Sequence, residues 1–172
     1  KRPLFIYLPE GYDKEDVKYP VIYILDGETR CTHGVPTIRF ISAEGLMPKA
    51  IVVGIPNTNR ERDFLPGRDK NPPTGDGANN FLQFITKDLF SYIEKQYKAD
   101  SYRILVGHSY GGLFAMHALL SQPDAFEAFI DTLYIDRGFE ETTQIVLDLI
   151  QEEIRSFSPE RKNKKKFKIN TK

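Results

Sequence analysis

Short apolar runs, separated by mixed segments, follow one another along the first 130 residues. Three of them lie at residues 20–25 (PVIYIL), 50–55 (AIVVGI) and 102–106 (YRILV), and a shorter one lies at residues 4–8. The runs at residues 20–25 and 50–55 lack the alternation of a half-buried strand, because apolar residues fill almost every position. Such runs are typical of strands buried on both faces of a parallel sheet.

Helical patterns lie between and after these runs. Residues 81–97 carry leucine and isoleucine at helical spacing, which predicts an amphipathic helix. Residues 113–121 predict an apolar helix that stops before a proline, and residues 36–44 predict a short helix that begins at Pro36 and ends before Gly45.

The order of these elements predicts the fold class. A further strand is expected at residues 128–130 and a second amphipathic helix at residues 140–157. Strands that alternate with helices predict an open, mostly parallel α/β sheet with helices on both faces. A long polar loop at residues 56–80 interrupts the alternation, and loops of this length are usually functional or mobile.

The segment GHSYG at residues 107–111 matches the nucleophile motif G-x-S-x-G. A predicted strand leads into it and a predicted helix leads out. In a nucleophile elbow, small residues allow a tight strand-to-helix turn that exposes the serine hydroxyl at the carboxyl end of the sheet. The N-terminus of the following helix favours negative charge that develops there. Ser109 is therefore the candidate nucleophile; a glycine-rich turn without chemistry is the alternative.

A serine nucleophile also needs backbone N–H groups aimed at the developing oxyanion. One is expected from Tyr110, and the other from the loop after residues 20–25, at Gly27 and Glu28. This loop leaves the carboxyl end of a predicted strand, which is the ligand-binding edge of open α/β sheets. An ordinary Asp-Gly turn is the alternative interpretation.

Four segments in this order carry a family resemblance: FIYLPEGYD, YPVIYILDGE, AIVVGIPNTNRERDFLP and RILVGHSYGGLFAMHALL. Together they resemble the "Putative esterase" family of α/β-hydrolases, which includes esterase D and the enterobactin-type siderophore esterases. The resemblance implies an α/β-hydrolase-like fold that is incomplete on its C-terminal side. The resemblance implies hydrolysis of a small-molecule carboxylic ester, either an acyl ester or a siderophore-type lactone, through an acyl-enzyme on Ser109. It also implies that Arg60, Arg62 and Asp63 line the mouth of the site and contact substrate. No metal or organic cofactor is expected.

The catalytic base is the difficulty in this interpretation. In this fold the triad runs serine, acid, histidine along the chain, yet no histidine follows residue 117. His108 adjoins the serine at a tight turn, and His117 lies two helical turns beyond it, about 12 Å away. His33 is expected in the loop after Gly27, where it is predicted to contact substrate rather than to serve as the base.

Three explanations for the missing base stay open. The chain lacks residues of the whole protein, or it is a catalytically impaired relative that binds a ligand without turnover, or another chain supplies the base. A serine hydroxyl without a base is a weak nucleophile. For the acid, Asp124, Asp131 and Asp136 all follow the elbow, and the last two are closer to the expected position.

The charge of the chain indicates which classes of binding partner the sequence favours. Lys and Arg number 24 and Asp and Glu number 24, so no net field favours nucleic acid or a membrane surface. Residues 159–172 hold seven basic residues and one acidic residue, which gives 7 − 1 = +6. We therefore expect a hydrolase domain at residues 1–157 and a basic, flexible tail at residues 158–172.

Other functions lack their sequence signals. The segment TGDGANN is not a nucleotide-binding loop, the cysteine and histidines have no zinc spacing, and no motif that reads bases is present. A run of apolar residues long enough to span a membrane is missing, and so is a signal peptide. The single cysteine, Cys31, cannot form an internal disulfide. Oligomeric state is left undetermined, as is the choice between cytoplasm and periplasm.

Overall fold

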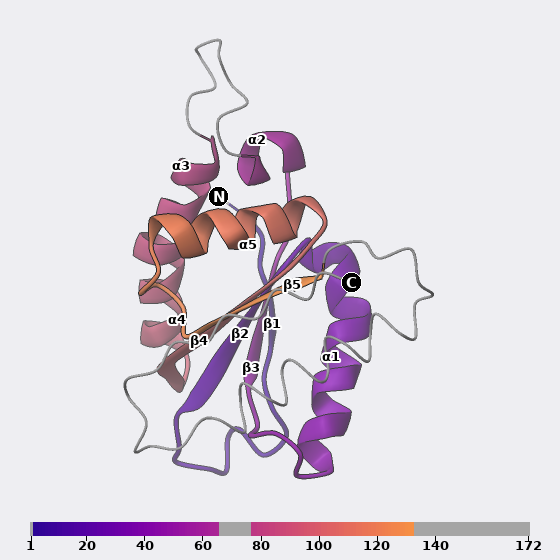
Figure 1. Cartoon of the computed structure of the whole chain (residues 1–172). Helices are drawn as coiled ribbons and strands as arrows, with labels where there is room; N and C mark the ends of the chain where they lie inside the picture. The colour runs from indigo at the N-terminus through magenta and orange to yellow at the C-terminus, as the bar shows by residue number, and fades with distance from the viewer. Residues whose placement is uncertain (1, 66–76, 133–172) are drawn as a thin grey trace.

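The computed structural model describes residues 2–65 and 77–132, which form one sheet flanked by helices (Figure 1). The strands are β1 (Phe5–Tyr7), β2 (Tyr19–Leu25), β3 (Ile51–Ile55), β4 (Ala99–His108) and β5 (Ala128–Thr132), in the order β1-β3-β2-β4-β5. The pairs β2–β3, β2–β4 and β4–β5 are parallel, and only β1 runs antiparallel to its neighbour within this sheet. The predicted mostly parallel sheet is confirmed; the predicted helix at residues 140–157, the tail and Asp136 lie outside the described residues.

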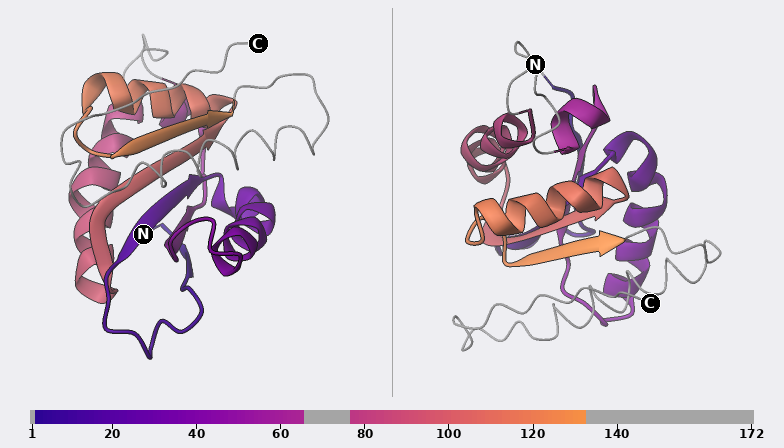
Figure 2. Two further views of the ribbon diagram at one scale, coloured as in Figure 1. Left: turned by 60° about the horizontal axis from the view of Figure 1, so that its bottom comes forward. Right: turned by 45° about the horizontal axis from the view of Figure 1, so that its top comes forward.

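Each face of the sheet packs against its own set of helices (Figure 2). Along β2, Val21, Tyr23 and Leu25 enter a core shared with α3 (Gly77–Gln83), α4 (Phe90–Gln96) and α5 (Tyr110–Ser121). The alternate residues Ile22 and Ile24 enter a second core against α1 (Gly27–Ala43). Burial on both faces explains why these strands lack a polar side.

Helix α1 begins earlier than the sequence predicted. The expected helix starts at Pro36, whereas α1 starts at Gly27 and contains that proline inside it. The buried side chains of α1 explain the difference, because they recur at helical spacing from the first turns onward: Cys31, Val35, Ile38 and Ile41. As a consequence His33 lies on the exposed side of a helix, and its predicted position in a loop is wrong.

The long polar loop contains a short helix that the sequence did not predict. Helix α2 (Arg60–Phe64) begins after Asn59, whose side chain accepts a hydrogen bond from the N–H of Arg62 at 3.0 Å. Phe64 is completely buried against Phe81 and Phe114. The predicted helix at residues 81–97 is observed as α3, a π-helical turn (Phe84–Leu89) and α4 in succession.

Close packing between β3 and α1 depends on Gly54. A Cβ atom at this position would lie 2.5 Å from the Sγ atom of Cys31. Burial raises the pKa of the Cys31 thiol to about 11, so the side chain stays neutral near pH 7. The two residues therefore form one small, apolar contact that leaves no room for an added methyl group.

We expect Gly54→Ala to lower the free energy of unfolding by about 1–3 kcal/mol, as other overpacked cores do. Cys31→Ala in the same chain removes the clashing sulfur, so the double variant should cost less than the sum of the two single variants. Urea unfolding of the four proteins measures this coupling. Strict additivity would contradict the proposed clash.

Candidate active site

Ser109 occupies a strained turn between β4 and α5. Its φ of 56° and ψ of −117° lie in a region that residues with a side chain rarely adopt. The carbonyl of Ser109 accepts the N–H of Leu113 at 3.0 Å, whereas its hydroxyl makes no capping hydrogen bond to α5. Strain of this kind costs about 1–3 kcal/mol and persists at functional sites. The backbone turn at this candidate nucleophile, called the elbow below, is therefore of the strained kind that the motif predicts.

Gly107, the first glycine of the motif, allows this turn. A Cβ atom on Gly107 would lie 2.1 Å from the carbonyl oxygen of Gly111, so no larger residue fits there. On Gly111, a Cβ atom would meet Leu25 at 3.5 Å and the Oδ2 atom of Asp26 at 3.8 Å, which are ordinary contacts. The first turn of α5 therefore packs directly against the end of β2.

The start of α1 lies at that same end of β2. Asp26 adopts a left-handed conformation with a φ of 53°, and a Cβ atom on Gly27 would lie 2.6 Å from the backbone of Gly54. The first intrahelical bonds run from Thr29 and Arg30 to the carbonyl of Asp26, both at 3.0 Å. The N–H groups at the start of an α-helix have no intrahelical acceptor. This applies to Gly27 and Glu28 in α1 and to Tyr110 in α5, the three predicted oxyanion donors.

Arg60 links these two helix starts. Its Nε atom donates to Oδ1 of Asp26 at 2.9 Å and its Nη2 atom donates to Oδ2 at 3.0 Å, which forms a bidentate ion pair. The same Nη2 atom lies 3.4 Å from the carbonyl oxygen of His108. The guanidinium carbon lies over the ring of Tyr110 at 5.3 Å and over that of Phe64 at 5.8 Å. Arg60 thus contacts the residues on both sides of Ser109.

Arg62 and Asp63 make different contacts from Arg60. The carboxylate of Asp63, whose residue is only 2% exposed, accepts from Nε of Arg62 at 2.7 Å and from Nη2 of Arg2 at 2.6 Å. The hydrogen bond to Asp63 raises the pKa of Arg62. Arg2 in turn lies over the ring of Phe81 at 4.7 Å. These contacts join α2 to the N-terminal segment and to α3.

Glu28 and the histidines complete the predicted site residues. Glu28 Oε2 accepts the backbone N–H of Asn57 at 3.2 Å, so it contacts the loop before α2. His117 lies on α5, where its Nε2 atom is 2.9 Å from Oδ1 of Asn79 and its Nδ1 atom is 3.4 Å from Oγ of Ser121. His33 lies on the exposed side of α1.

The predicted acids lie after α5. Asp124 is in the turn that follows this helix, and Asp131 is on β5, where its backbone is in register with Gly107 of β4. The sequence missed the pairing of Asp26 with Arg60, because 34 residues separate the two and no motif connects them.

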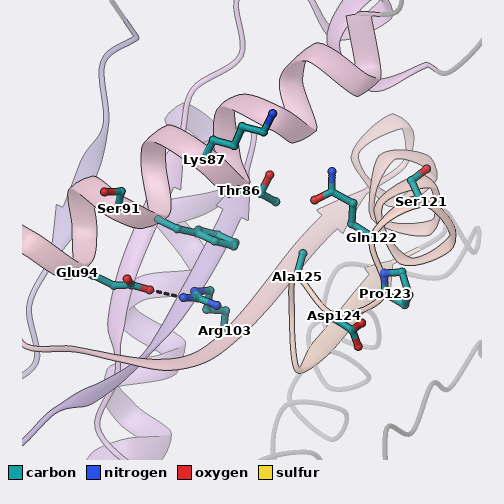
Figure 3. Close-up of a pocket in the computed structure, with 11 residues that line it drawn as sticks. Thr86, Lys87, Ser91, Glu94, Arg103, Ser121, Gln122, Pro123, Asp124 and Ala125 are labelled. Carbon is teal, nitrogen blue, oxygen red and sulfur yellow. Dashed lines mark hydrogen bonds and ion pairs between the residues drawn. The ribbon is translucent and has the colours of Figure 1, made fainter.

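A cleft of about 640 Å³ lies at the other end of α5 (Figure 3). Ser121 and the turn after it form one wall, and the other wall comes from the π-helical turn and α4. Helix α5 rises about 1.5 Å per residue, so Ser121 is about 18 Å from Ser109 along the helix axis. The Arg103–Glu94 ion pair lines this cleft. The cleft is therefore separate from the elbow.

The sheet order, the strained serine and the two helix starts beside it define an α/β-hydrolase-like domain. Residues 1–130 match the family described as "Putative esterase", and the chain belongs to this family. The predicted family and the predicted α/β-hydrolase-like fold are both confirmed.

Two of the similar proteins are named as esterases of siderophores. The chain is 36% identical over 134 residues to the ferri-bacillibactin esterase BesA of Bacillus subtilis, a match that covers 65% of this chain and 46% of the relative. It is 31% identical over 146 residues to a siderophore enterobactin esterase of Emericella nidulans, covering 70% of this chain and 48% of the relative.

A solved structure is similar as well. The IroE-like serine hydrolase of Shewanella oneidensis matches with a TM-score of 0.67 and 39% identity, over 88% of this chain and 51% of that chain. The chain thus spans about half the length of the relatives it matches. Among the helices of residues 2–65 and 77–132, none has the length and apolarity needed to cross a bilayer.

The strain at Ser109 gives a stability prediction. We expect Ser109→Gly to be about 1 kcal/mol more stable than Ser109→Ala, because glycine adopts a positive φ without steric cost while its extra unfolded-state entropy offsets part of the gain. Chemical denaturation of the two variants measures the difference. Equal stability of the two would contradict a strained elbow.

Proposed function

We propose that this protein hydrolyses a carboxylic ester, either an acyl ester or a siderophore-type lactone, through an acyl-enzyme on Ser109. The observation that carries the proposal is the strained serine at the start of α5, next to the start of α1. Membership of an esterase family and the similarity to siderophore esterases support the choice of substrate class.

The chemistry has two stages. The Oγ atom of Ser109 attacks the ester carbonyl and its proton passes to a base; the tetrahedral intermediate then expels the alcohol, which leaves protonated. Water then attacks the carbonyl of the acyl-enzyme and gives a proton to the base. The second tetrahedral intermediate expels the Oγ atom of Ser109, which regains a proton, and the acid is released. We assign stabilisation of the oxyanion to the N–H of Tyr110 and to an N–H of Gly27 or Glu28, aided by the two helix N-termini.

Substrate contacts are proposed for the side chains near these donors. The side chains of Arg60 and Arg62 are each 40% exposed, and His33 is exposed on the first half of α1. Asp63 is almost fully buried, so its proposed contribution is to hold the two neighbouring arginines rather than to touch substrate over a large area.

Whether a catalytic base activates Ser109 decides between the esterase proposal and its alternative. All histidines of the sequence lie at or before residue 117, and His117 is engaged with Asn79. The second candidate is a protein that binds the same ligand without turnover, because a serine hydroxyl without a base is a weak nucleophile. The two differ in whether Ser109 is activated.

We expect wild-type protein to release alcohol from a simple aryl ester and to open a catecholate trilactone, as followed by absorbance and by mass spectrometry. Ser109→Ala should reduce both rates at least about 10³-fold, in line with the loss of a serine nucleophile. A fluorophosphonate should label Ser109, identified by peptide mass. Binding of the trilactone without hydrolysis and without labelling would support the ligand-binding alternative instead.

A histidine variant tests where the base lies. We expect His117→Ala to keep hydrolysis within about twofold of wild type, because His117 is about 12 Å along α5 from the elbow and its ring bonds Asn79. Steady-state kinetics with the aryl ester measure this, and His33→Ala is assayed beside it. A loss of about 10³-fold in kcat for His117→Ala would identify it as the base and contradict the expectation.

A further inference from the structure

We propose that Arg60 is a positioning residue that fixes the two oxyanion-binding segments relative to each other, by pairing with Asp26 while contacting the elbow. The proposal rests on the proposed esterase function. Its basis is that a single guanidinium joins the start of α1 to the residues on both sides of Ser109.

The ion pair with Asp26 ties Arg60 to the start of α1. Asp26 is 5% exposed, and a buried carboxylate without a partner is costly. Two parallel hydrogen bonds, at 2.9 and 3.0 Å, satisfy both of its oxygens. The same residue begins α1, since its carbonyl accepts the N–H groups of Thr29 and Arg30. The direction of the Gly27 and Glu28 N–H groups therefore depends on where the guanidinium holds Asp26.

The contacts with the elbow tie Arg60 to the start of α5. Nη2 lies 3.4 Å from the carbonyl oxygen of His108, the residue before the nucleophile. The guanidinium lies 5.3 Å from the ring centre of Tyr110, the residue after it. A hydrogen bond and a cation–π contact thus restrain the peptide groups on both sides of the Ser109 side chain.

Only an arginine provides all of these contacts. The flat guanidinium presents several N–H donors in a fixed fork and stacks on aromatic rings, whereas a lysine ammonium is a point charge. Lysine at position 60 would keep the charge and lose the bidentate geometry. The conservative substitution therefore distinguishes positioning by a rigid fork from a purely electrostatic effect.

The chain offers a matched control in the middle of β4. Arg103 pairs with Glu94 and lies 4.3 Å from the ring centre of Phe90, so it also combines an ion pair with a cation–π contact. It lines the cleft of Figure 3, away from the elbow. Arg103→Gln removes an interaction of the same kind without touching the proposed oxyanion donors.

The experiment compares Arg60→Gln, Arg60→Lys, Asp26→Asn, the double variant Asp26→Asn/Arg60→Gln and Arg103→Gln in the full chain. With an aryl ester, we expect kcat of Arg60→Gln to fall about 10- to 100-fold with KM within about threefold, because misplaced donors weaken the transition state more than the ground state. The kcat of Arg60→Lys should be nearly as low as that of Arg60→Gln. The kcat of the double variant should be no lower than that of the slower single variant. The kcat of Arg103→Gln should stay within about twofold of wild type.

Amide hydrogen exchange provides a second readout that does not need turnover. Exchange at residues 26–30 and 109–112 should be faster in Arg60→Gln and in Asp26→Asn than in wild type, and unchanged at these positions in Arg103→Gln. Should Arg60→Gln fail to fold, as judged by thermal unfolding, Arg60→Lys and Asp26→Asn carry the same comparison.

The outcomes separate the two proposals. Unchanged kcat in an active protein overturns the positioning role, and so does a raised KM with unchanged kcat, which would mark Arg60 as a substrate contact alone. Wild-type protein that does not hydrolyse esters overturns the proposed function. In that case the exchange rates still decide: faster exchange in Arg60→Gln supports positioning, and unchanged exchange overturns it.

Discussion

The parallel pairing of β2 with β4 determines where the two helix starts of the candidate site lie. The two strands are neighbours in register, with Ile24 opposite Val106. Two residues after this pair, both strands have reached the same edge of the sheet: Asp26 follows the end of β2, and His108 is the last residue of β4. Because both strands run in the same direction, the helices that follow begin side by side at that edge. The strained serine and the proposed oxyanion donors meet there for this reason.

The packing around this edge requires very small residues. Gly107 lies against the carbonyl of Gly111, and Gly27 lies against the backbone of Gly54, so added side chains would force the segments apart. Close approach of backbones at these two places allows α1 and α5 to begin next to each other. Gly107 and Gly27 thus serve one common geometry.

Charge then stabilises what the backbone brings together. Helix α2 provides Arg60 to the edge of the sheet, and Asp63 on the same helix binds Arg62 and Arg2. Buried carboxylates with two or more donors hold their neighbours in a defined geometry. A five-residue helix in a polar loop therefore connects the elbow, the start of α1 and the N-terminal segment.

The sequence alone determined the buried strands, the nucleophile motif and the family, because apolar runs, a short glycine-serine motif and several ordered segments are local signals. It placed the start of α1 wrongly, since Cys31 is the only large apolar residue in its first turns. It missed α2, since Phe64 is the only apolar residue of that helix. The pairing of Asp26 with Arg60 came only from the tertiary structure. Residues 34 apart in the chain meet when strand order and helix packing bring them together, and nothing in the local pattern of either residue encodes that meeting.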